Sequence, residues 1–384
     1  MASPERFGSY LVYEQIGKGG MATVHRAELV TPRGDKEEVA LKRLVPTTKP
    51  ELVKIFVEEG RLLRYLSHPN IAGARAAGRQ FGTYYITMEY IRGRTLKELV
   101  EHCRQGVGAV PQAVTLHLAA QLCDALDHAH TRTDGYGNPL VIIHRDVTPA
   151  NLLISETGLL KLIDFGLAKA KGTQAEDSAV GVIKGKYGYI APEYLAGTID
   201  HRADLWAAGI IMYELLTSRR LFEGADAYET MMRVRELPIP RPSLANPQVT
   251  PELDRIVMTA LERDLDRRWQ SAAAMRDAIR VLLEQPDNAM DNQGVADWIQ
   301  WAYEQKPGRK PQLTPIVPMM AQPPPPDTPE AMEVDVDLDV DPADAVRLPW
   351  LAAIPWTLPN LVWAACAGAI VLLLLGAIVW KIVG

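Results

Sequence analysis

The sequence has little cysteine, no excess of basic residues and no apolar run at its start. Its three cysteines, Cys103, Cys123 and Cys366, are too few and too scattered for a disulfide framework or a zinc site. A reducing, cytosolic setting is therefore the default for most of the chain. Lys and Arg number 41 against 47 Asp and Glu, so the formal net charge is −6 and we expect no nucleic-acid partner. The opening residues, MASPERFGSY, contain no apolar segment, so we expect no secretory signal.

Most of the chain has the composition of a folded protein, and this composition changes twice toward the C-terminus. Hydrophobic residues make up 47% and charged residues 23%, which excludes a wholly disordered or collagen-like chain. Residues 307–349 are predicted to form a Pro-rich acidic linker, because a stretch so rich in proline cannot bury enough apolar surface to fold. Within it, the alternating run Glu333–Asp341 favours a solvated acidic spacer, and a strand added to a partner's sheet is the alternative.

Residues 361–380, LVWAACAGAIVLLLLGAIVW, are predicted to form a transmembrane helix. The run carries no charge, and at 1.5 Å per residue it is about 30 Å long, the thickness of a bilayer's hydrocarbon core. Tryptophans lie near both ends, as in the interfacial belts of membrane proteins: Trp350, Trp356, Trp363 and Trp380. The sequence therefore predicts a single-pass membrane anchor.

The residues that flank this span, and those on its surface, give only weak indications of its orientation and of its assembly. Arg347 precedes the run and Lys381 follows it, which is too small a difference to set the orientation. Ala364 and Gly368 form a small-xxx-small pair, which is compatible with packing of two spans and hence with a homodimer.

Three N-terminal features are each ambiguous alone. The segment Ile16–Val24, IGKGGMATV, is typical either of a plain hairpin or of a glycine-rich turn whose N–H groups approach a polyphosphate. The short apolar strand Val39–Lys42 ends in a lysine that either snorkels to solvent or binds phosphate. Glu59 lies on the apolar face of a predicted helix, where an aliphatic residue is expected.

Further motifs resolve the ambiguity. The segment Ile142–Leu153 contains His-Arg-Asp at 144–146 with Asn151 five residues after the aspartate, Asp-Phe-Gly follows at 164–166, and Ala-Pro-Glu at 191–193. A glycine-rich loop, VALK, HRD with its Asn, DFG and APE in this order form the protein-kinase signature set. Over residues 10–283 the chain resembles the eukaryotic-like serine/threonine protein kinases of bacteria.

The resemblance implies an α+β fold of two lobes, with a small β-rich N-lobe, a larger helical C-lobe and ATP between them. It also implies that Arg268 pairs with Glu193 of the APE motif. Residues 284–306 are predicted to add a helical extension, because apolar residues recur on one stripe from Val295 to Ala302. We expect this extension to cover the C-lobe, and a partner-docking helix is the alternative.

Carried over motif by motif, the resemblance implies five chemical roles. Lys42 would hold the α- and β-phosphates and would itself be held by Glu59. Asp164 and Asn151 would bind Mg²⁺, with Mn²⁺ as a substitute. Asp146 would orient the attacking hydroxyl and accept its proton.

The resemblance also implies a nucleotide site made of the glycine-rich loop, the hinge and the adenine pocket. Its expected members are Ile16, Gly17, Lys18, Gly19, Gly20, Met21, Ala22, Thr23, Val24, Ala40, Lys42, Met88, Glu89, Ile91 and Leu153.

Three positions depart from the family pattern. Ala22 replaces the third loop glycine, a mild change if that position needs only a small side chain. Thr148 stands where these kinases usually carry a lysine near the γ-phosphate, and Lys186 stands where they usually carry a threonine. We hypothesise that the two residues are exchanged, so that Lys186 reaches Asp146 and Thr148 accepts a hydrogen bond from it. The alternative is a solvated Lys186 and low activity.

Two segments around the catalytic motifs carry further expectations. Residues 128–140 are longer than the usual turn and are predicted to form a polar, hairpin-like loop; His128 and His130 point to different faces, so metal binding is not expected. Between Gly166 and Gly185 the hydroxyl residues are Thr173 and Ser178, and a phosphate on either would pair with Arg145.

The sequence thus predicts an enzyme that phosphorylates serine or threonine in protein substrates, itself included, tethered by one span to the cytoplasmic face of a bacterial inner membrane. Two rivals stay open: a nucleotide-binding pseudokinase scaffold, which Thr148 favours, and a small-molecule kinase, which the APE-bearing segment disfavours. Tyrosine also remains open as the acceptor, because the lysine that marks serine/threonine specificity is the residue replaced by Thr148.

Overall fold

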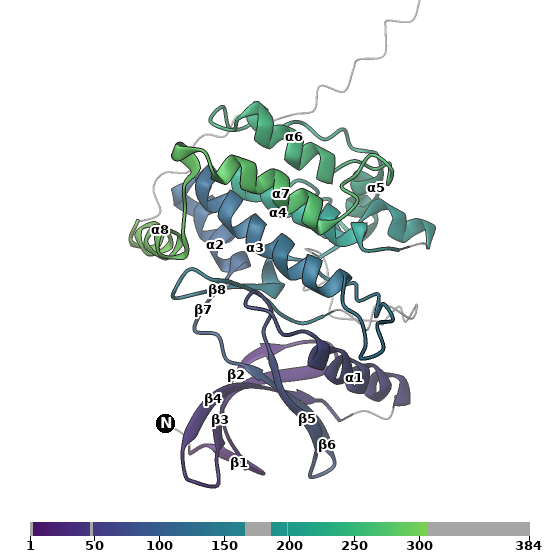
Figure 1. Ribbon diagram of the computed structural model, residues 1–384, viewed down its shortest axis with the longest axis vertical. Coiled ribbons are helices and arrows are strands. Elements are labelled where there is room, and N and C mark those ends of the chain that lie inside the picture. Colours follow the sequence, from purple (N-terminus) through teal and green to yellow (C-terminus); the bar gives the residue numbers. More distant parts are fainter. Residues whose placement is uncertain (1–2, 47–48, 166–185, 198, 306–384) are drawn as a thin grey trace, which may run out of the picture. The chain divides into compact units, whose positions relative to one another are not determined.

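The computed structural model describes residues 3–46, 49–165, 186–197 and 199–305 (Figure 1). Within these ranges no helix is both long and apolar enough to cross a bilayer. The predicted linker at 307–349, the predicted span at 361–380 and the candidate phosphosites Thr173 and Ser178 all lie outside the described residues.

The N-lobe is a six-stranded antiparallel sheet with strand order β1-β2-β3-β4-β6-β5. Its strands are β1 (Glu5–Phe7), β2 (Tyr10–Lys18), β3 (Ala22–Val30), β4 (Lys36–Leu44), β5 (Ala74–Gln80) and β6 (Thr83–Glu89). In the registers Val24↔Lys42 and Ala40↔Met88, paired residues project from the same face. Because alternate residues of a strand share a face, these four side chains lie on one face of the sheet.

One helix, α1 (Pro50–Leu62), packs against this sheet. Proline at its first position suits a helix start, since that N–H has no partner within the helix. Ile55 and Phe56 are buried, and so is Glu59, which is 1% exposed. A carboxylate buried this deeply needs a partner, and it finds one at the candidate active site.

The C-lobe is helical and encloses a small antiparallel sheet of order β7-β8-β9. Its helices are α2 (Leu96–His102), α3 (Gln112–His130), α4 (Arg202–Thr217), α5 (Ala227–Glu236), α6 (Pro251–Ala260) and α7 (Ala272–Leu283), and the strands are β7 (Gly93–Thr95), β8 (Leu152–Ser155) and β9 (Leu160–Leu162). α4 is buried on every side, as expected of a helix that is hydrophobic all round. The lobes confirm the predicted two-lobed fold.

A last helix, α8 (Asn292–Glu304), lies against the C-lobe (Figure 1). It begins at Asp291, whose carboxylate accepts a hydrogen bond from the Gly294 N–H at 2.8 Å. Val295 and Ala302 are fully buried, whereas Trp301 is 50% exposed on the outer side. The apolar stripe therefore faces the C-lobe.

The segment after α3 forms the expected hairpin-like loop. The Asp134 N–H donates to the Asn138 carbonyl and the Leu140 N–H donates to the Arg132 carbonyl, which closes the loop across its base. The Asp134 carboxylate accepts hydrogen bonds from the N–H groups of Tyr136 and Asn138. The loop is thus held by its own backbone hydrogen bonds and by the Asp134 side chain.

A buried ion pair joins the APE motif to the end of the C-lobe, as predicted. Arg268 donates from Nη1 and Nη2 to the two carboxylate oxygens of Glu193, at 2.6 and 3.0 Å. The Arg268 side chain is 0% exposed and that of Glu193 is 7% exposed. A two-point contact at this depth fixes the segment that follows the candidate active site.

We expect Arg268→Met to lower the free energy of unfolding by about 3–5 kcal/mol, because it leaves the Glu193 carboxylate buried without its partner. Urea denaturation followed by circular dichroism measures this loss. Arg267→Met is the matched control, since Arg267 is 70% exposed and its pair with Glu262 is expected to contribute less than about 1 kcal/mol. Equal losses in the two variants would contradict the prediction.

Candidate active site

The loop that carries Asp146 is held in place by the buried carboxylate of Asp204. The N–H groups of His144 and Arg145 each donate to a carboxylate oxygen of Asp204, both at 2.8 Å. Burial alone would raise the pKa of Asp204, but the hydrogen bond from His130 and these backbone donors hold it below its ordinary value. Arg145 has a φ of +64°, a conformation that non-glycine residues adopt only when contacts enforce it.

His144 orients the backbone on the other side of the same loop. Its Nε2 donates to the Ile163 carbonyl at 3.0 Å, and its Nδ1 accepts from the Asp146 N–H at 3.2 Å. Burial lowers the pKa of His144, so the imidazole is neutral and can serve as donor and acceptor at once. The position of Asp146 is thereby tied to the residues just before Asp164.

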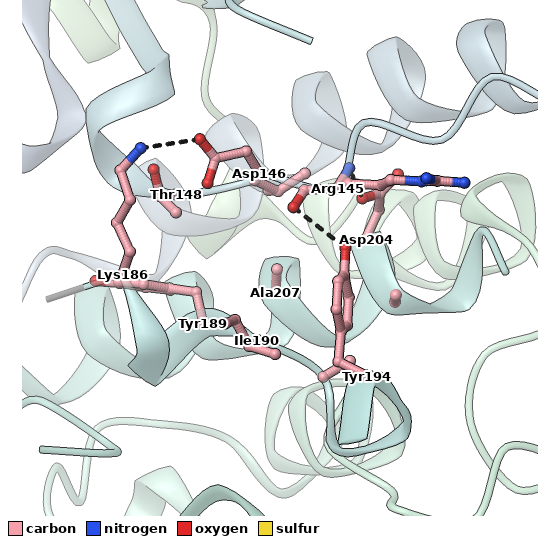
Figure 2. Close-up of a pocket in the computed structure, with 12 residues that line it drawn as sticks. Arg145, Asp146, Thr148, Lys186, Tyr189, Ile190, Tyr194, Asp204 and Ala207 are labelled. Atoms are coloured by element: carbon pink, nitrogen blue, oxygen red, sulfur yellow. Dashed lines mark hydrogen bonds and ion pairs between the residues drawn. The ribbon is translucent and has the colours of Figure 1, made fainter. Parts of the chain in front are cut away.

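The Asp146 carboxylate is contacted by Asn151 and by Lys186, of which Figure 2 shows Lys186. Asn151 donates from Nδ2 to Asp146 Oδ2 at 2.9 Å and to the Asp146 carbonyl at 2.8 Å. The Lys186 ammonium donates to the same Oδ2 at 3.1 Å. Lys186 lies 40 residues away along the chain, at the start of the short 3-10 helix Tyr187–Tyr189. The structure therefore places a positive charge directly beside the candidate base.

The predicted hydrogen bond between Thr148 and Lys186 is wrong. The Thr148 side chain is 4% exposed, and its Oγ1 has no hydrogen-bond partner among the described residues. The reason is geometric: the Lys186 ammonium is directed to the Asp146 carboxylate, the stronger, charged acceptor. Thr148 nevertheless lines the same surface hollow as Asp146 and Lys186 (Figure 2).

A second charged cluster joins the two lobes. Lys42 of β4 donates from Nζ to Glu59 Oε1 at 2.6 Å and to Asp164 Oδ1 at 2.9 Å. Burial opposes the charged form of Lys42, but the two carboxylates outweigh it and keep the pKa of Lys42 above its ordinary value. Glu59 thus has the partner that its burial requires.

Asp164 is held in an unusual conformation. Its φ is +55°, and the following Phe165 is buried against the His144 ring, with ring centroids 4.6 Å apart. The Ile163 N–H donates to the Asn151 carbonyl at 3.0 Å, which brings the two predicted metal ligands onto adjoining backbone. The Asp164 carboxylate is 36% exposed, so it can still meet a ligand.

Asn151 and Asp164 carry the amide and carboxylate oxygens that suit a magnesium ion. Within the described ranges no group of three or more His, Cys, Asp or Glu side chains is placed to hold a metal alone. Mg²⁺ in nucleotide sites needs only one or two protein ligands, because phosphates and water supply the rest. Asn151 uses Nδ2 on Asp146, so Oδ1 is the atom through which it would bind a cation.

The predicted nucleotide residues lie on the β2–β3 hairpin, on β4 and β6, just after β6, and on β8. The glycine-rich segment Ile16–Val24 is the β2–β3 hairpin, closed by a hydrogen bond from the Gly19 N–H to the Ala22 carbonyl at 2.8 Å. Ala40 and Met88 lie on the sheet face that carries Lys42, and Ile91 follows β6. Leu153 lies on β8 of the C-lobe. Glu89 accepts from Lys161 through one carboxylate oxygen at 2.8 Å, and its N–H donates to the Gly73 carbonyl at 2.9 Å.

Sequence reasoning missed the buried polar groups behind the site. Besides Asp204, the Tyr189 hydroxyl donates to Glu214 of α4 at 2.7 Å, and Arg104 donates to the same carboxylate oxygen at 3.2 Å. The available signal was an acidic residue within an otherwise apolar helix, since such a residue must be paired. This network fixes the segment that carries Lys186.

A β-sheet lobe with a Lys–Glu pair, facing a helical lobe with a loop-borne Asp and Asn, is the architecture of a protein kinase. Residues 10–279 match the family described as "Protein kinase domain", and the chain belongs to that family.

Similar proteins agree with this assignment. The chain is 33% identical over 282 residues to the "Tyrosine-protein kinase MasK" of Myxococcus xanthus, covering 73% of this chain and 44% of that protein. It is 33% identical over 295 residues to the "Serine/threonine-protein kinase PknB" of Mycobacterium leprae, covering 74% of this chain and 45% of PknB. The chain thus spans less than half the length of these curated relatives. The crystal structure of the Mycobacterium tuberculosis PknI kinase domain matches with a TM-score of 0.54 and 25% identity, over 73% of this chain and 99% of that kinase domain.

Proposed function

We propose that this chain is a protein kinase that transfers the γ-phosphate of ATP to serine or threonine hydroxyls of proteins, including its own. One observation carries the proposal: Lys42 bridges Glu59 and Asp164 while Asn151 and Lys186 both contact Asp146. Phosphoryl transfer requires positioning and neutralisation of charge more than covalent chemistry. A set of residues already assembled in this way supports turnover.

In the proposed reaction the oxygen of the substrate hydroxyl bonds to the γ-phosphorus, and Asp146 accepts the proton of that hydroxyl. The bond from that phosphorus to the bridging oxygen breaks, and ADP departs with the electron pair. Asn151 holds the Asp146 carboxylate in place through its Nδ2. Lys42 would bind the α- and β-phosphates, with Glu59 fixing the position of its ammonium group.

Asp164 and Asn151 would hold the magnesium ions, which neutralise the phosphate oxygens when bound. Asp164 is already oriented by Lys42, so the chain holds this carboxylate in one place before any ligand arrives. The glycine-rich hairpin would cover the phosphates, and Val24, Ala40 and Leu153 would enclose the adenine.

We also propose that Lys186 replaces the lysine that the family carries at the position of Thr148. The Lys186 ammonium lies 3.1 Å from Asp146 Oδ2, where positive charge would stabilise the transferring phosphoryl group. The Lys186 side chain is 43% exposed, so it can turn from Asp146 toward a phosphate when a substrate arrives.

A second candidate acceptor is tyrosine. MasK, which is named a tyrosine-protein kinase, is among the relatives matched over 73% of this chain. The missing lysine at Thr148 points the same way, since that lysine marks serine/threonine specificity in the family. The relatives named serine/threonine kinases outweigh this, and the same experiment tests both.

The full 384-residue chain, incubated with γ-labelled ATP and magnesium, should label itself and added protein substrate. Phosphoamino-acid analysis should then find phosphoserine or phosphothreonine. If only phosphotyrosine were found, the acceptor would be tyrosine and not serine or threonine. Nucleotide binding without any transfer, in the presence of magnesium or manganese and with membranes added, would establish a pseudokinase scaffold instead.

We further propose that residues 10–283 are the kinase domain, 284–306 its helical extension and 307–349 a linker to a membrane span at 361–380. ATP is cytoplasmic, so the kinase domain would face the cytoplasm of a bacterial inner membrane. The pair Ala364 and Gly368 is compatible with a homodimer through the span.

Deleting residues 361–384 is expected to move the chain from the membrane pellet to the supernatant, because it removes the whole apolar run. Fractionation at high salt, with the full chain beside the deletion, measures this. Replacing 361–380 with an unrelated transmembrane sequence should restore the pellet. A deletion that stayed in the pellet after a high-salt wash would refute the anchor.

A further inference from the structure

The last turn of α8 contacts β7 and the end of α2. The Tyr303 ring stacks on the His102 ring, with centroids 4.3 Å apart and planes 18° from parallel. The Arg94 guanidinium lies 4.1 Å from the centre of the same Tyr303 ring. His102 Nε2 donates to the Ala302 carbonyl at 2.8 Å. We call these four residues the α8 clasp (α8 is labelled in Figure 1).

Arg94 and His102 belong to short elements beside the expected nucleotide site. Arg94 is the middle residue of β7, which pairs with β8 in the registers Arg94↔Ile154 and Thr95↔Leu153. Leu153 is the expected floor of the adenine pocket. His102 is the last residue of α2, and Thr95, the last residue of β7, caps the first turn of that helix. The clasp therefore holds the middle of β7 and the far end of α2 at once.

The first turn of α8 is tied to the other side of the site. Asn292 Oδ1 accepts from His117 Nε2 at 2.8 Å and from Gln121 Nε2 at 3.0 Å. Gln121 Oε1 in turn accepts from Asn70 Nδ2 and from the Leu160 N–H, both at 2.8 Å. Leu160 begins β9, the strand that leads to Asp164. The two ends of α8 are thus bound to the two segments that flank the expected nucleotide.

β7 and α2 cannot hold this geometry by themselves. β7 has three residues and α2 has seven, and isolated helices of fewer than about 12 residues are marginal in water. Their placement must come from tertiary contacts. α8 supplies one such contact to β7, between Tyr303 and Arg94.

We propose that α8 is a brace of the nucleotide pocket and that Tyr303 is its positioning residue. Tyr303 touches no expected ligand; it acts through Arg94 and His102, which set β7 and α2 and thereby the strand that carries Leu153. This inference rests on the proposed ATP-dependent function. It assigns residues beyond the matched kinase domain, which ends at residue 279, to the binding of ATP.

The test measures binding of ADP with magnesium to the full chain by calorimetry, together with thermal unfolding. Tyr303→Ala is expected to weaken binding about three- to tenfold, since it removes a ring stack and a cation–π contact. Tyr303→Phe should bind as wild type, because the Tyr303 hydroxyl is buried with no hydrogen-bond partner among the described residues. Trp301→Ala, on the exposed side of the same helix, is the matched control and should also bind as wild type.

Arg94→Ala covers the case in which Tyr303→Ala fails to fold, because Arg94 is exposed and its loss leaves no buried group unpaired. It should weaken ADP binding about threefold. In the transfer assay it should raise KM for ATP by the same factor and leave kcat near that of wild type. The double variant Arg94→Ala/Tyr303→Ala should lose less than the two single losses combined.

Two results would overturn the brace. Variants that melt earlier yet bind ADP as wild type would make α8 a structural element only. Losses of ADP binding in Arg94→Ala and Tyr303→Ala that add independently would show that the two residues do not act on the pocket through their contact with each other. A wild-type chain that binds no nucleotide would refute the proposed function and the brace together, whereas a wild type that binds ADP isolates the test of the brace.

Discussion

Replacing Asp146 with asparagine is expected to slow phosphoryl transfer by about 10²- to 10⁴-fold while leaving nucleotide binding within about twofold of wild type. The amide keeps the shape of the carboxylate but cannot accept the proton of the attacking hydroxyl. The Asp146 side chain is 11% exposed, and Asp146 is not itself among the expected nucleotide or metal ligands. The loss should therefore appear in kcat.

Single-turnover transfer from labelled ATP and calorimetric ADP binding separate the two quantities. Asp266→Asn is the matched control, because Asp266 is 97% exposed and far along the chain from the motifs. An Asp146→Asn variant within about tenfold of wild type would remove Asp146 as the general base. A variant whose ADP binding fell by the same factor as its transfer rate would show instead that Asp146 maintains the structure of the site.

Lys186→Thr is expected to lower the rate of transfer by about 10²-fold, the usual loss when one charge-stabilising group is removed from a transition state. In the wild type the ammonium lies 3.1 Å from Asp146 Oδ2. Without it, the site has a buried Thr148 where the family has a lysine.

The double variant Thr148→Lys/Lys186→Thr should recover most of that rate, because it restores the family arrangement of the two residues. Thr148 lines the same hollow as Asp146 and Lys186, so a lysine introduced there starts beside the same carboxylate (Figure 2). The four rates give a coupling energy between the two positions. Lys36→Thr is the control for simple loss of a lysine, since Lys36 is 53% exposed and pairs with Glu28 at the edge of the N-lobe.

Unchanged turnover in Lys186→Thr would mean that the pair with Asp146 is a solvated surface contact. Such pairs contribute little, and the Lys186 side chain is 43% exposed, so this outcome is physically coherent. A double variant no faster than Lys186→Thr would show that the two positions do not substitute for each other.

The sequence predicted the two-lobed fold and the contact between Lys42 and Glu59, because kinase chemistry demands particular residues at particular spacings. Lys42, Glu59 and Asp164 are separated by up to 122 positions, yet their side chains meet within 2.9 Å. Each could be recognised from its local motif, since a lysine ending an apolar strand or a glutamate on an apolar helix face is out of place without a partner.

The sequence predicted individual hydrogen bonds less well. The proximity of Lys186 to Asp146 was expected, but the bond from Lys186 to Thr148 was not formed. A lysine has three donors on a flexible stem, and its choice among nearby acceptors depends on their charge and direction. Residue spacing contains neither quantity.

The sequence by itself determined which family this chain belongs to, because each motif is local and each names its own chemistry. Only the tertiary structure decided how α8 is used. The stripe from Val295 to Ala302 predicts a buried face, but a helical period does not say which surface that face meets. The contacts of Tyr303 with Arg94 and His102 join positions about 200 residues apart, and they exist because packing of the C-lobe brings α8 to the end of α2.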